Sequence, residues 1–411
     1  MGIDNNDLLA FNESMAITAG VGSGQGNDAY EVGVNACKNA FDQLGQPDAD
    51  LVIVFSSVVY DQKKVIEGVR SVSKNALLVG SSTAGEITNN GPAKKSVVVM
   101  VIKSDQITFA AGAGNDIKTD AKKAGHDAAD QVKKQLGDKL KTFILLTDTL
   151  SGNGSEVLRG VLDVVGQHFP VVGGGSGDDA QYKQTFQYFN NDVLSGSAVG
   201  LGLAGSFKFS MGVKHGWVSL SPVLKVTKSS GAIVQEIDGN PAIEVYEKYL
   251  GTERAQQLKE TVLAKLALSY PLGMQVEGSD ELLLRAPFFV DKQGSITCGG
   301  EVPQGSEVRI MVGSSKEAIE AAKQAAQKLL DQLGSKPKAI LLFNCHVRDK
   351  LLGPKAKEEI DAMQEIIGKD VPLIGFYTYA EQAPLAGEVR NIERCNPSLH
   401  NETVAMFALG E

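Results

Sequence analysis

The sequence is poor in cysteine, proline and aromatic residues. Its 411 residues include 4 cysteines, 13 prolines and 6% aromatic residues. No two cysteines form a CxxC pair, so no disulfide framework is visible, and we expect reduced thiols in a cytoplasmic protein. The longest apolar runs, such as Val97 to Ile102, have the length of a strand and are too short to span a membrane. We therefore expect no membrane insertion.

Basic charge and common enzyme motifs are also lacking. Forty Lys and Arg residues stand against 49 Asp and Glu residues, a net charge of −9, which argues against a nucleic-acid partner. The segment Met1 to Ser14 has no Lys or Arg and no apolar run, so it does not resemble a secretory signal. The sequence contains no GxxxxGK[ST] and no GxSxG, which removes the P-loop and the nucleophile elbow.

The five histidines form no metal-ligand pattern. Cys345-His346 and the segment from Cys395 to His400 fall in the same part of the chain but lack the spacing of zinc ligands. The glycine-rich run Gly20 to Gly26 has the spacing GxGxGxG, which differs from the dinucleotide-binding GxGxxG. We therefore predict no metal and no cofactor.

Glycine, in contrast, is abundant, with 45 residues, and many of these glycines recur within an internal repeat. Three blocks show the same order of apolar strands and amphipathic helices. The blocks begin with predicted strands at Met15 to Gly22, Ile107 to Gly114 and Val308 to Ser315. In each block a helix ends at a Gln-Leu-Gly sequence, which begins at Gln43, Gln135 or Gln332. A glycine at this place supplies the left-handed residue that closes a helix.

The blocks predict an α/β protein. Leu51 to Phe55, Phe143 to Leu146 and Ala339 to Phe343 are continuously apolar, as in parallel strands covered on both faces. We expect repeated β-α-β-α-β-β units that form mixed, largely parallel sheets with helices packed on them. Residues 206–304 do not repeat. The predicted domains are therefore residues 1–215, with two repeats, and residues 216–411, with an α+β insert (216–304) followed by a third repeat (305–411).

Polar residues follow the apolar strands of every block. Ligands of open α/β sheets bind outside the carboxyl ends of the parallel strands. The candidate binding residues at these ends are Ser56, Ser57, Ser81, Ser82, Thr83, Glu86, Asp148, Gly174, Ser176, Asp179, Asn344, Cys345, Tyr377 and Glu381. An acid follows the second strand at the same spacing in all three blocks, as Glu86, Asp179 and Glu381. It can accept a hydrogen bond from a ligand ammonium group or cap a helix.

Two further interpretations stay open for these residues. The polar strand ends are equally explained as structural turns that were duplicated with the unit, because turns and caps use the same residue types. Arg285 lies between apolar strand residues, where a half-buried guanidinium needs an ion partner. That partner is either a ligand carboxylate or an acid of the protein itself.

Several segments, taken in order, resemble the FIST sensory domain, with its N-terminal and C-terminal parts. These segments are DLVIVFSS, LLVGSSTAGEI, PVVGGGSGDD, VQEIDGNPAIEVYEKYLG, LLRAPFFVDKQGSITCGGEVPQGSEV and PLIGFYTYAEQ. The resemblance implies a sensor of small ligands such as amino acids, usually attached to signalling output domains in bacteria. The sequence departs from it at Ala380-Glu381, where the family often has Gly-Glu. No output segment follows the last predicted strand, Thr403 to Leu409, so we expect a separate signalling output protein as partner.

Three hypotheses for the function follow. The first is a small-ligand-binding sensory protein of signal transduction, in which Ser81, Ser82, Thr83 and Glu86 hold one end of an amino acid or similar polar ligand and Arg285 holds its carboxylate. The second is an enzyme of unassigned class, hydrolase-like, with Cys345 or a serine at a strand end as nucleophile. The third is a scaffold whose glycines serve architecture alone. We favour the sensor over the enzyme, because the polar strand ends occur three times and the segments resemble the FIST sensory domain, and the enzyme stays the alternative.

Overall fold

The fold of the chain was analysed in a computed structural model, which describes residues 17–251, 253 and 270–411; the segment Met1 to Ser14 lies outside them. The first repeat consists of β1 (Ile17–Gly24), α1 (Ala29–Leu44), β2 (Leu51–Ser56), α2 (Gln62–Ser73), β3 (Leu77–Ser82), β4 (Glu86–Thr88), β5 (Gly91–Ala93) and β6 (Val97–Ser104). The second consists of β7 (Ile107–Gly114), α3 (Ala121–Leu136), β8 (Leu140–Thr147), α4 (Gly154–Val165), β9 (Val171–Gly175), β10 (Gln187–Phe189), β11 (Asp192–Leu194) and β12 (Ala198–Gly205).

The third repeat is interrupted by a long insertion after its first strand. It consists of β13 (Lys208–Lys214), α7 (Ser315–Leu333), β23 (Ala339–Cys345), α8 (His346–Leu352), α9 (Ala356–Ile367), β24 (Leu373–Thr378), β25 (Glu381–Pro384), β26 (Pro397–His400) and β27 (Val404–Gly410). Short 3-10 turns lie at Gly137–Lys139, Gly353–Lys355, Leu385–Gly387 and Ile392–Arg394. The strand β13 pairs with β27 as β1 pairs with β6 and β7 with β12.

This pairing corrects one detail of the predicted third repeat. The strand predicted at Val308 to Ser315 is β22 (Glu307–Val312), which belongs to the inserted lobe and pairs there with β15 and β18. The pattern of apolar residues alone does not tell whether β13 or β22 is the first strand of the repeat, because both strands are largely buried. The position of Gln332 does tell it: its side-chain amide donates to the Met211 carbonyl of β13, 2.9 Å away, as Gln135 donates to Ala111 of β7.

Three mixed sheets result, and each borrows a hairpin from another repeat. Their strand orders are β1-β6-β2-β3-β10-β11, β26-β25-β9-β8-β12-β7 and β13-β27-β23-β24-β4-β5. The mixed α/β sheets of the prediction are confirmed, although among the described residues parallel pairing is confined to the central pairs β2–β3, β8–β9 and β23–β24. Each borrowed hairpin is antiparallel to the second strand of a parallel pair. The three repeats therefore form one interlocked body.

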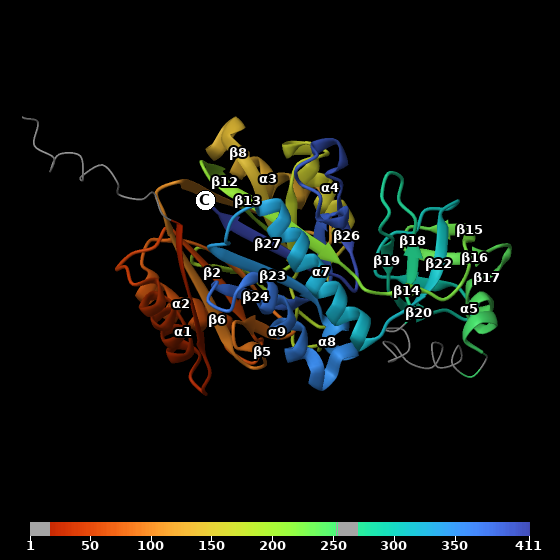
Figure 1. The fold of residues 1–411 in the computed structure, drawn as a ribbon, viewed down its shortest axis with the longest axis horizontal. Coiled ribbons are helices and arrows are strands. Elements are labelled where there is room, and N and C mark those ends of the chain that lie inside the picture. The colour runs from red at the N-terminus through yellow and green to blue at the C-terminus, as the bar shows by residue number, and fades with distance from the viewer. Residues whose placement is uncertain (1–16, 252, 254–269) are drawn as a thin grey trace, which may run out of the picture.

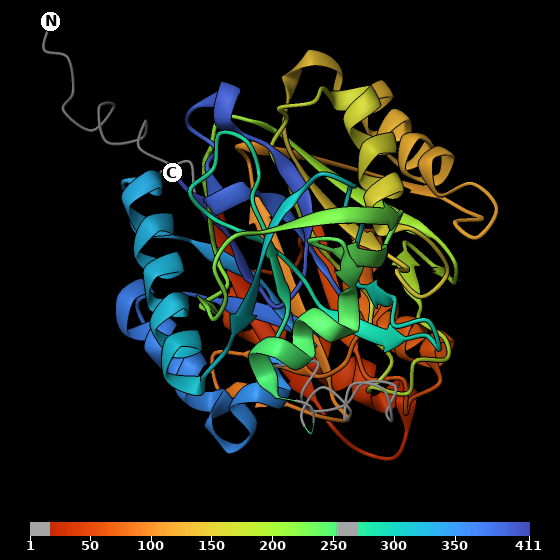
Figure 2. The same cartoon turned by 90° about the vertical axis from the view of Figure 1, so that its right-hand side faces the viewer.

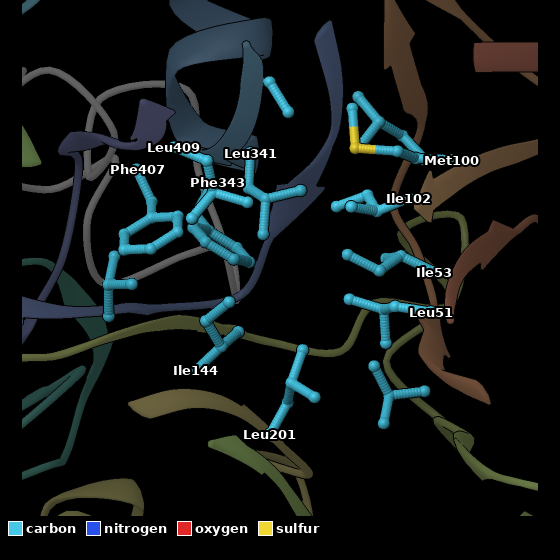
Figure 3. Packing of buried hydrophobic residues seen from close by; sticks show 14 of the residues in the cluster. Leu51, Ile53, Met100, Ile102, Ile144, Leu201, Leu341, Phe343, Phe407 and Leu409 are labelled. Carbon is cyan, nitrogen blue, oxygen red and sulfur yellow. The ribbon is translucent and has the colours of Figure 1, made fainter. Parts of the chain in front are cut away.

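The three sheets surround one apolar core and carry helices on their outer faces. Figure 3 shows this core between the sheets, with Leu51, Ile53, Met100 and Ile102 from the first repeat, Ile144 and Leu201 from the second, and Leu341, Phe343, Phe407 and Leu409 from the third. The outer faces pack against α1 and α2, against α3 and α4, and against α7 and α9. Both faces of the central strands are thus covered, which explains why their sequences are continuously apolar.

The insertion forms a separate lobe at one side of this body (Figure 1), and Figure 2 views the molecule with the lobe toward the reader. Its elements are β14 (Val218–Ser219), β15 (Leu224–Ser230), β16 (Ile233–Ile237), β17 (Asn240–Pro241), α5 (Ala242–Leu250), β18 (Leu272–Met274), β19 (Leu283–Arg285), β20 (Pro287–Val290), β21 (Ile296–Cys298) and β22. The lobe has its own apolar core, which includes Tyr246 and Ile310. The chain enters it after Lys214 and leaves it before Ser315.

Two further observations bear on the sequence predictions. The four cysteines are all free and buried. Within the described ranges, the helices are either too short or too polar to cross a membrane.

Candidate functional site

The predicted carboxylates of the first and third repeats lie in matching hydrogen-bond clusters. Glu86, the first residue of β4, bonds to the hydroxyl of Thr83 and accepts the Ser96 N–H at 3.2 Å. Glu381, the first residue of β25, bonds to the hydroxyl of Thr378 and accepts the Thr403 N–H at 3.2 Å. Each carboxyl therefore joins two strands of one sheet. It links the end of the second strand of the parallel pair (β3 or β24) to the beginning of the last strand of the repeat (β6 or β27).

The second repeat has a glutamine at this place. Gln187, the first residue of β10, donates to the Ser176 hydroxyl at 3.0 Å and accepts the Ser197 N–H at 3.2 Å. The register agrees, because Gln187 pairs with Ser81 as Glu381 pairs with Gly174 and as Glu86 pairs with Phe376. The structural equivalent of Glu86 and Glu381 is thus Gln187. The sequence spacing selected Asp179 instead, because the loop before this position is longer in the second repeat.

Burial keeps both glutamates from ionising readily. Desolvation raises the pKa of Glu86 to about 7 and that of Glu381 to about 8, against the hydrogen bonds that lower them. A protonated carboxyl presents one O–H donor and one C=O acceptor, which is the pattern a glutamine amide offers. In slightly acidic solution, the side chain at this position is therefore uncharged in all three clusters, and it can donate one hydrogen bond and accept another.

Asp179 and its neighbour Asp178 hold a strained loop. Asp179 accepts the Ser57 hydroxyl at 2.7 Å and the Val58 N–H at 3.1 Å. Asp178, which is buried, accepts the N–H groups of the three residues 182–184 and bonds to the Tyr379 hydroxyl. Asp179, Ala180 and Tyr182 all have left-handed backbones, with φ of 53°, 63° and 53°. Such strain persists only where the surroundings over-determine the backbone.

The remaining predicted residues at the strand ends have internal partners or lie deep in the body. The Ser82 hydroxyl donates to the Gly177 carbonyl at 2.7 Å, and Asp148 accepts the N–H groups of Leu150 and Ser151 at 3.0 Å. Three further candidates are equally enclosed, with Asn344 bonded to Glu359, Ser56 to the Ser57 carbonyl, and Gly174 in contact with the Thr378 side chain. The hydroxyls of Ser81 and Tyr377 are buried and find no hydrogen-bond partner among the described residues. A role in ligand binding stays a prediction for these residues.

Arg285 is buried in the lobe and bonds to carbonyl groups. Its Nε donates to the Glu301 carbonyl at 2.8 Å, and its Nη1 donates to the carbonyls of Leu284 and Leu399 at 2.9 and 3.0 Å. Desolvation lowers the pKa of this guanidinium to about 10. Because Leu399 belongs to β26, Arg285 ties the lobe to the body. Its predicted contact with a ligand carboxylate is not tested by this arrangement.

A cavity of about 530 Å³ lies between the body and the lobe. The body contributes the loop after β8, the beginnings of α4 and α8, and the end of β24; the lobe contributes β20 and the segment after β21. The lining residues are Thr149, Leu150, Gly152, Asn153, Gly154, Tyr182, Ala232, Phe288, Cys298, Gly299, Gly300, Glu301, Cys345, His346, Val347, Thr378, Tyr379, Ala380 and Leu399. Cys345 is the one predicted binding residue among them. The volume suits a small organic ligand.

Few of the lining groups are charged. Glu301 is paired with Arg159 of α4 and accepts the Asn153 amide at 2.8 Å. His346 is 4% exposed, and within the described chain its two ring nitrogens have no hydrogen-bond partner. Burial lowers the pKa of His346 to about 3, so the ring is neutral, and burial raises the pKa of the Cys345 thiol well above its usual value.

The cavity contains functional candidates that the sequence analysis did not select. Tyr182 and Tyr379 stack with ring centroids 4.8 Å apart, and His346 meets Tyr379 edge-on. Tyr182 gave no sequence signal, since it lies in an irregular loop. The segment Gly299-Gly300-Glu301 did give one, because it forms part of the GGEVPQG stretch on which the family resemblance rests.

The fold and the cavity define a class: an α/β protein with a ligand-sized cavity between an interlocked body and an inserted lobe. The chain belongs to the FIST family: the FIST N domain matches residues 50–240 and the FIST C domain matches residues 242–384. FIST domains are associated with the sensing of small ligands in signal transduction.

Two curated relatives of this chain have low sequence identity to it. An uncharacterised protein of Methanocaldococcus jannaschii is 27% identical over 233 residues, which are 54% of this chain and 43% of the relative. An uncharacterised protein of Mycobacterium tuberculosis is 25% identical over 238 residues, 57% of this chain and 60% of the relative. The chain thus matches between 43% and 60% of the length of these relatives.

Solved structures give weak similarities. A cyanuric acid hydrolase from A. caulinodans aligns with a TM-score of 0.26 and 11% identity, over 46% of this chain and 72% of that one. A chorismatase aligns with a TM-score of 0.37 and 8% identity, over 97% of this chain and all of that one. At these scores neither similarity supports a statement about the activity of this chain.

Proposed function

We propose that this protein is a small-ligand-binding sensory protein and that its ligand occupies the cavity between the body and the lobe. The observation that carries the proposal is the cavity itself, which has the volume of a small-molecule site and is lined by an almost fully buried His346 without a hydrogen-bond partner among the described residues. An unpaired buried polar group costs about 1–3 kcal/mol. A ligand that supplies the missing hydrogen bond recovers part of that cost.

The lobe is the part that would transmit binding. A limited set of polar contacts joins it to the body near the cavity: Glu301 with Asn153 and Arg159, Arg285 with the Leu399 carbonyl, and the Ala286 N–H with Asn401. A ligand that touches both parts favours one placement of the lobe over others, since a ligand shifts an equilibrium by its differential affinity. A separate signalling output protein would read that placement.

The ligand suggested by the family resemblance is an amino acid. In favour of it are the beginning of α4, where Gly154 lies in the cavity lining and Asn153 caps the helix by accepting the Ser155 N–H, and the neutral His346. A zwitterion also needs a partner for its ammonium group. The one acidic side chain of the lining, Glu301, is already paired with Arg159. The amino-acid ligand therefore stands as a prediction for direct testing.

A thermal-shift screen of the full chain against small metabolites, including the common amino acids, tests the proposal. A true ligand at about 100 times its Kd adds roughly 2.7 kcal/mol to the free energy of unfolding. Ala232 lines the cavity from a lobe hairpin, so Ala232→Trp fills part of it, whereas Ser230→Trp places the same ring on an exposed position of that hairpin.

The two variants decide the outcome. We expect a ligand whose shift persists in Ser230→Trp and disappears in Ala232→Trp. If every compound leaves the midpoint unchanged, or if the shift survives in Ala232→Trp, the cavity is not the ligand site.

A further inference from the structure

The body side of the cavity carries a pair of stacked aromatic rings. Tyr182 stacks on Tyr379 at an interplanar angle of 18°, yet it remains 41% exposed. The Tyr379 hydroxyl is bonded to Asp178, so Tyr379 is fixed in place. From the lobe side, Phe288 also lines the cavity. Stacked aromatic rings with an open face are suited to a further flat ring.

The backbone holds Tyr182 in this place at a conformational cost. Three residues of the loop, Asp179, Ala180 and Tyr182, have left-handed backbones although none is glycine. A left-handed backbone is unfavourable for a residue that carries a Cβ atom. The carboxylate of Asp178 offsets the strain by accepting the Tyr182 N–H at 2.8 Å and the N–H groups of the next two residues. Strain of this kind gathers at ligand sites.

The described side chains that line the cavity offer no unpaired countercharge to an ionic ligand, and the nearby Asp349 carboxylate lies behind the lining, 4.0 Å from Nδ1 of His346. Of its lining side chains, Glu301 is ionised and paired, and His346 is neutral. Taking an ion out of water without a countercharge is costly. A neutral imidazole offers one N–H donor and one acceptor nitrogen, which match an amide or a ring nitrogen with a neighbouring N–H.

We propose that the cavity selects an uncharged, planar ring compound, which stacks on Tyr182 and forms a hydrogen bond with His346. This inference rests on the proposed function, since it names the ligand class of the same cavity. It also makes Tyr182 the specificity-determining residue of the site. Amino acids and other ionised compounds are then weak ligands.

Matched pairs of probes test the ligand class on the full chain. Benzamide and nicotinamide are uncharged rings, and benzoate and nicotinate are their ionised counterparts of nearly the same size. We expect the uncharged member of a pair to bind at least about tenfold more tightly by isothermal titration. Tyr182→Phe should keep the affinity within about threefold, and Tyr182→Ala should lower it at least about tenfold.

The structure provides controls for these variants. Tyr30 is exposed to a similar degree, 38%, and lies on α1, outside the cavity, so Tyr30→Ala should change nothing. Phe288→Leu removes the ring on the lobe side and gives a second test should Tyr182→Ala fold poorly; we expect it to weaken binding as well.

The outcomes separate the two proposals. If an ionised probe or an amino acid binds best and Ala232→Trp abolishes that binding, the cavity is a ligand site and the proposed ligand class is wrong. If both Tyr182→Ala and Phe288→Leu bind the uncharged probe as the parent does, the aromatic contact is wrong. If neither the probes nor the wider screen yields a ligand, both proposals fail.

Discussion

The second repeat differs from the first and third at one position of their shared hydrogen-bond cluster. Gln187 occupies the place of Glu86 and Glu381 and bonds to the same two kinds of group, a hydroxyl and a backbone N–H. The substitution of an amide for a carboxyl shows that the cluster needs a neutral donor and acceptor rather than a negative charge. Ionisation of the two glutamates should therefore work against the fold, and their role in ligand binding stays a prediction.

The third repeat differs from the first in a second respect. Glu86 and Glu381 are both fully buried, but Glu86 also accepts the Ser96 hydroxyl, and its cluster contributes no residue to the cavity lining. The third cluster lies below the cavity, where Thr378 and Cys345 are lining residues. Close to it lie a second buried carboxyl, Glu402, and the buried ion pair of Arg348 and Glu359. Of the two glutamate clusters, the one in the third repeat therefore adjoins the candidate ligand site.

The largest effect is expected from the buried ion pair of Arg348 and Glu359. Arg348→Met leaves the Glu359 carboxylate buried without its countercharge and removes the hydrogen bonds of Arg348 to the carbonyls of His215 and Ala318. We expect a loss of about 3–5 kcal/mol in the free energy of unfolding, measured by urea denaturation.

Two further variants control this prediction. Arg348→Met combined with Glu359→Gln should recover a large part of the loss, because the unpaired charge is gone. Lys350→Met lies on the same helix α8 at an exposed position and should change stability by less than about 0.5 kcal/mol. A full-size loss in the double variant would contradict the assignment of the cost to the unpaired Glu359.

The next effect is a dependence of stability on pH, which distinguishes a glutamate from a glutamine at the same position of the cluster. Since the pKa of Glu381 rises on folding to about 8, the carboxyl contributes its full stability below the unfolded pKa. That stability is lost as pH rises to 8, at about 1.4 kcal/mol per pH unit. Glu86 behaves likewise up to its pKa of about 7. Glu381→Gln should therefore gain stability over the parent as pH rises from 5 to 8, measured by denaturation at several pH values.

The reciprocal variant is the matched test. Gln187→Glu introduces a carboxyl into the equivalent cluster, and we expect it to add a loss of stability with rising pH where the parent has none from this position. Parallel pH profiles for the parent and both variants would mean that these side chains are ionised in the folded protein and that the comparison is mistaken.

The smallest expected effect concerns Cys345 and separates the sensor from the hydrolase hypothesis. The thiol is 3% exposed, and its pKa is raised well above the usual value, so little nucleophilic thiolate forms. We expect iodoacetamide at neutral pH to leave Cys345 of the native chain unmodified for hours, as seen by peptide mass spectrometry, and to modify it quickly in urea. Rapid modification of the native chain at Cys345 would favour a cysteine nucleophile.

Much of the fold could be predicted from local signals. The run of apolar residues in Leu51 to Phe55 predicts a covered strand, and the spacing of apolar residues in α7 predicts a helix that ends at Gly334, whose left-handed backbone has φ of 68°. The exchange of hairpins was not predictable in this way. It depends on which sheet edge a short segment such as β4 meets in space, and β4 carries no sign of its partner in its own sequence.

The candidate site was less predictable than the fold. The sequence placed polar residues at the strand ends, but it could not tell Asp179 from Gln187 as the equivalent of Glu86, because the intervening loop changed the spacing. It also assigned Arg285 by its apolar neighbours, whereas the guanidinium donates to the carbonyls of Glu301, 16 positions away, and Leu399, 114 positions away. The division into residues 1–215 and 216–411 stays a prediction.

Local patterns in the chain were enough to predict the covered strands, the helix ends and the family, because these depend on residues a few positions apart. The place of the cavity follows only from the folded arrangement. That outcome depends on the lobe folding against the ends of β8, β23 and β24, and on contacts between Tyr182 and Tyr379 across nearly two hundred positions of sequence. Packing between such distant segments leaves no periodic pattern in the chain, and so only their arrangement in space reveals it.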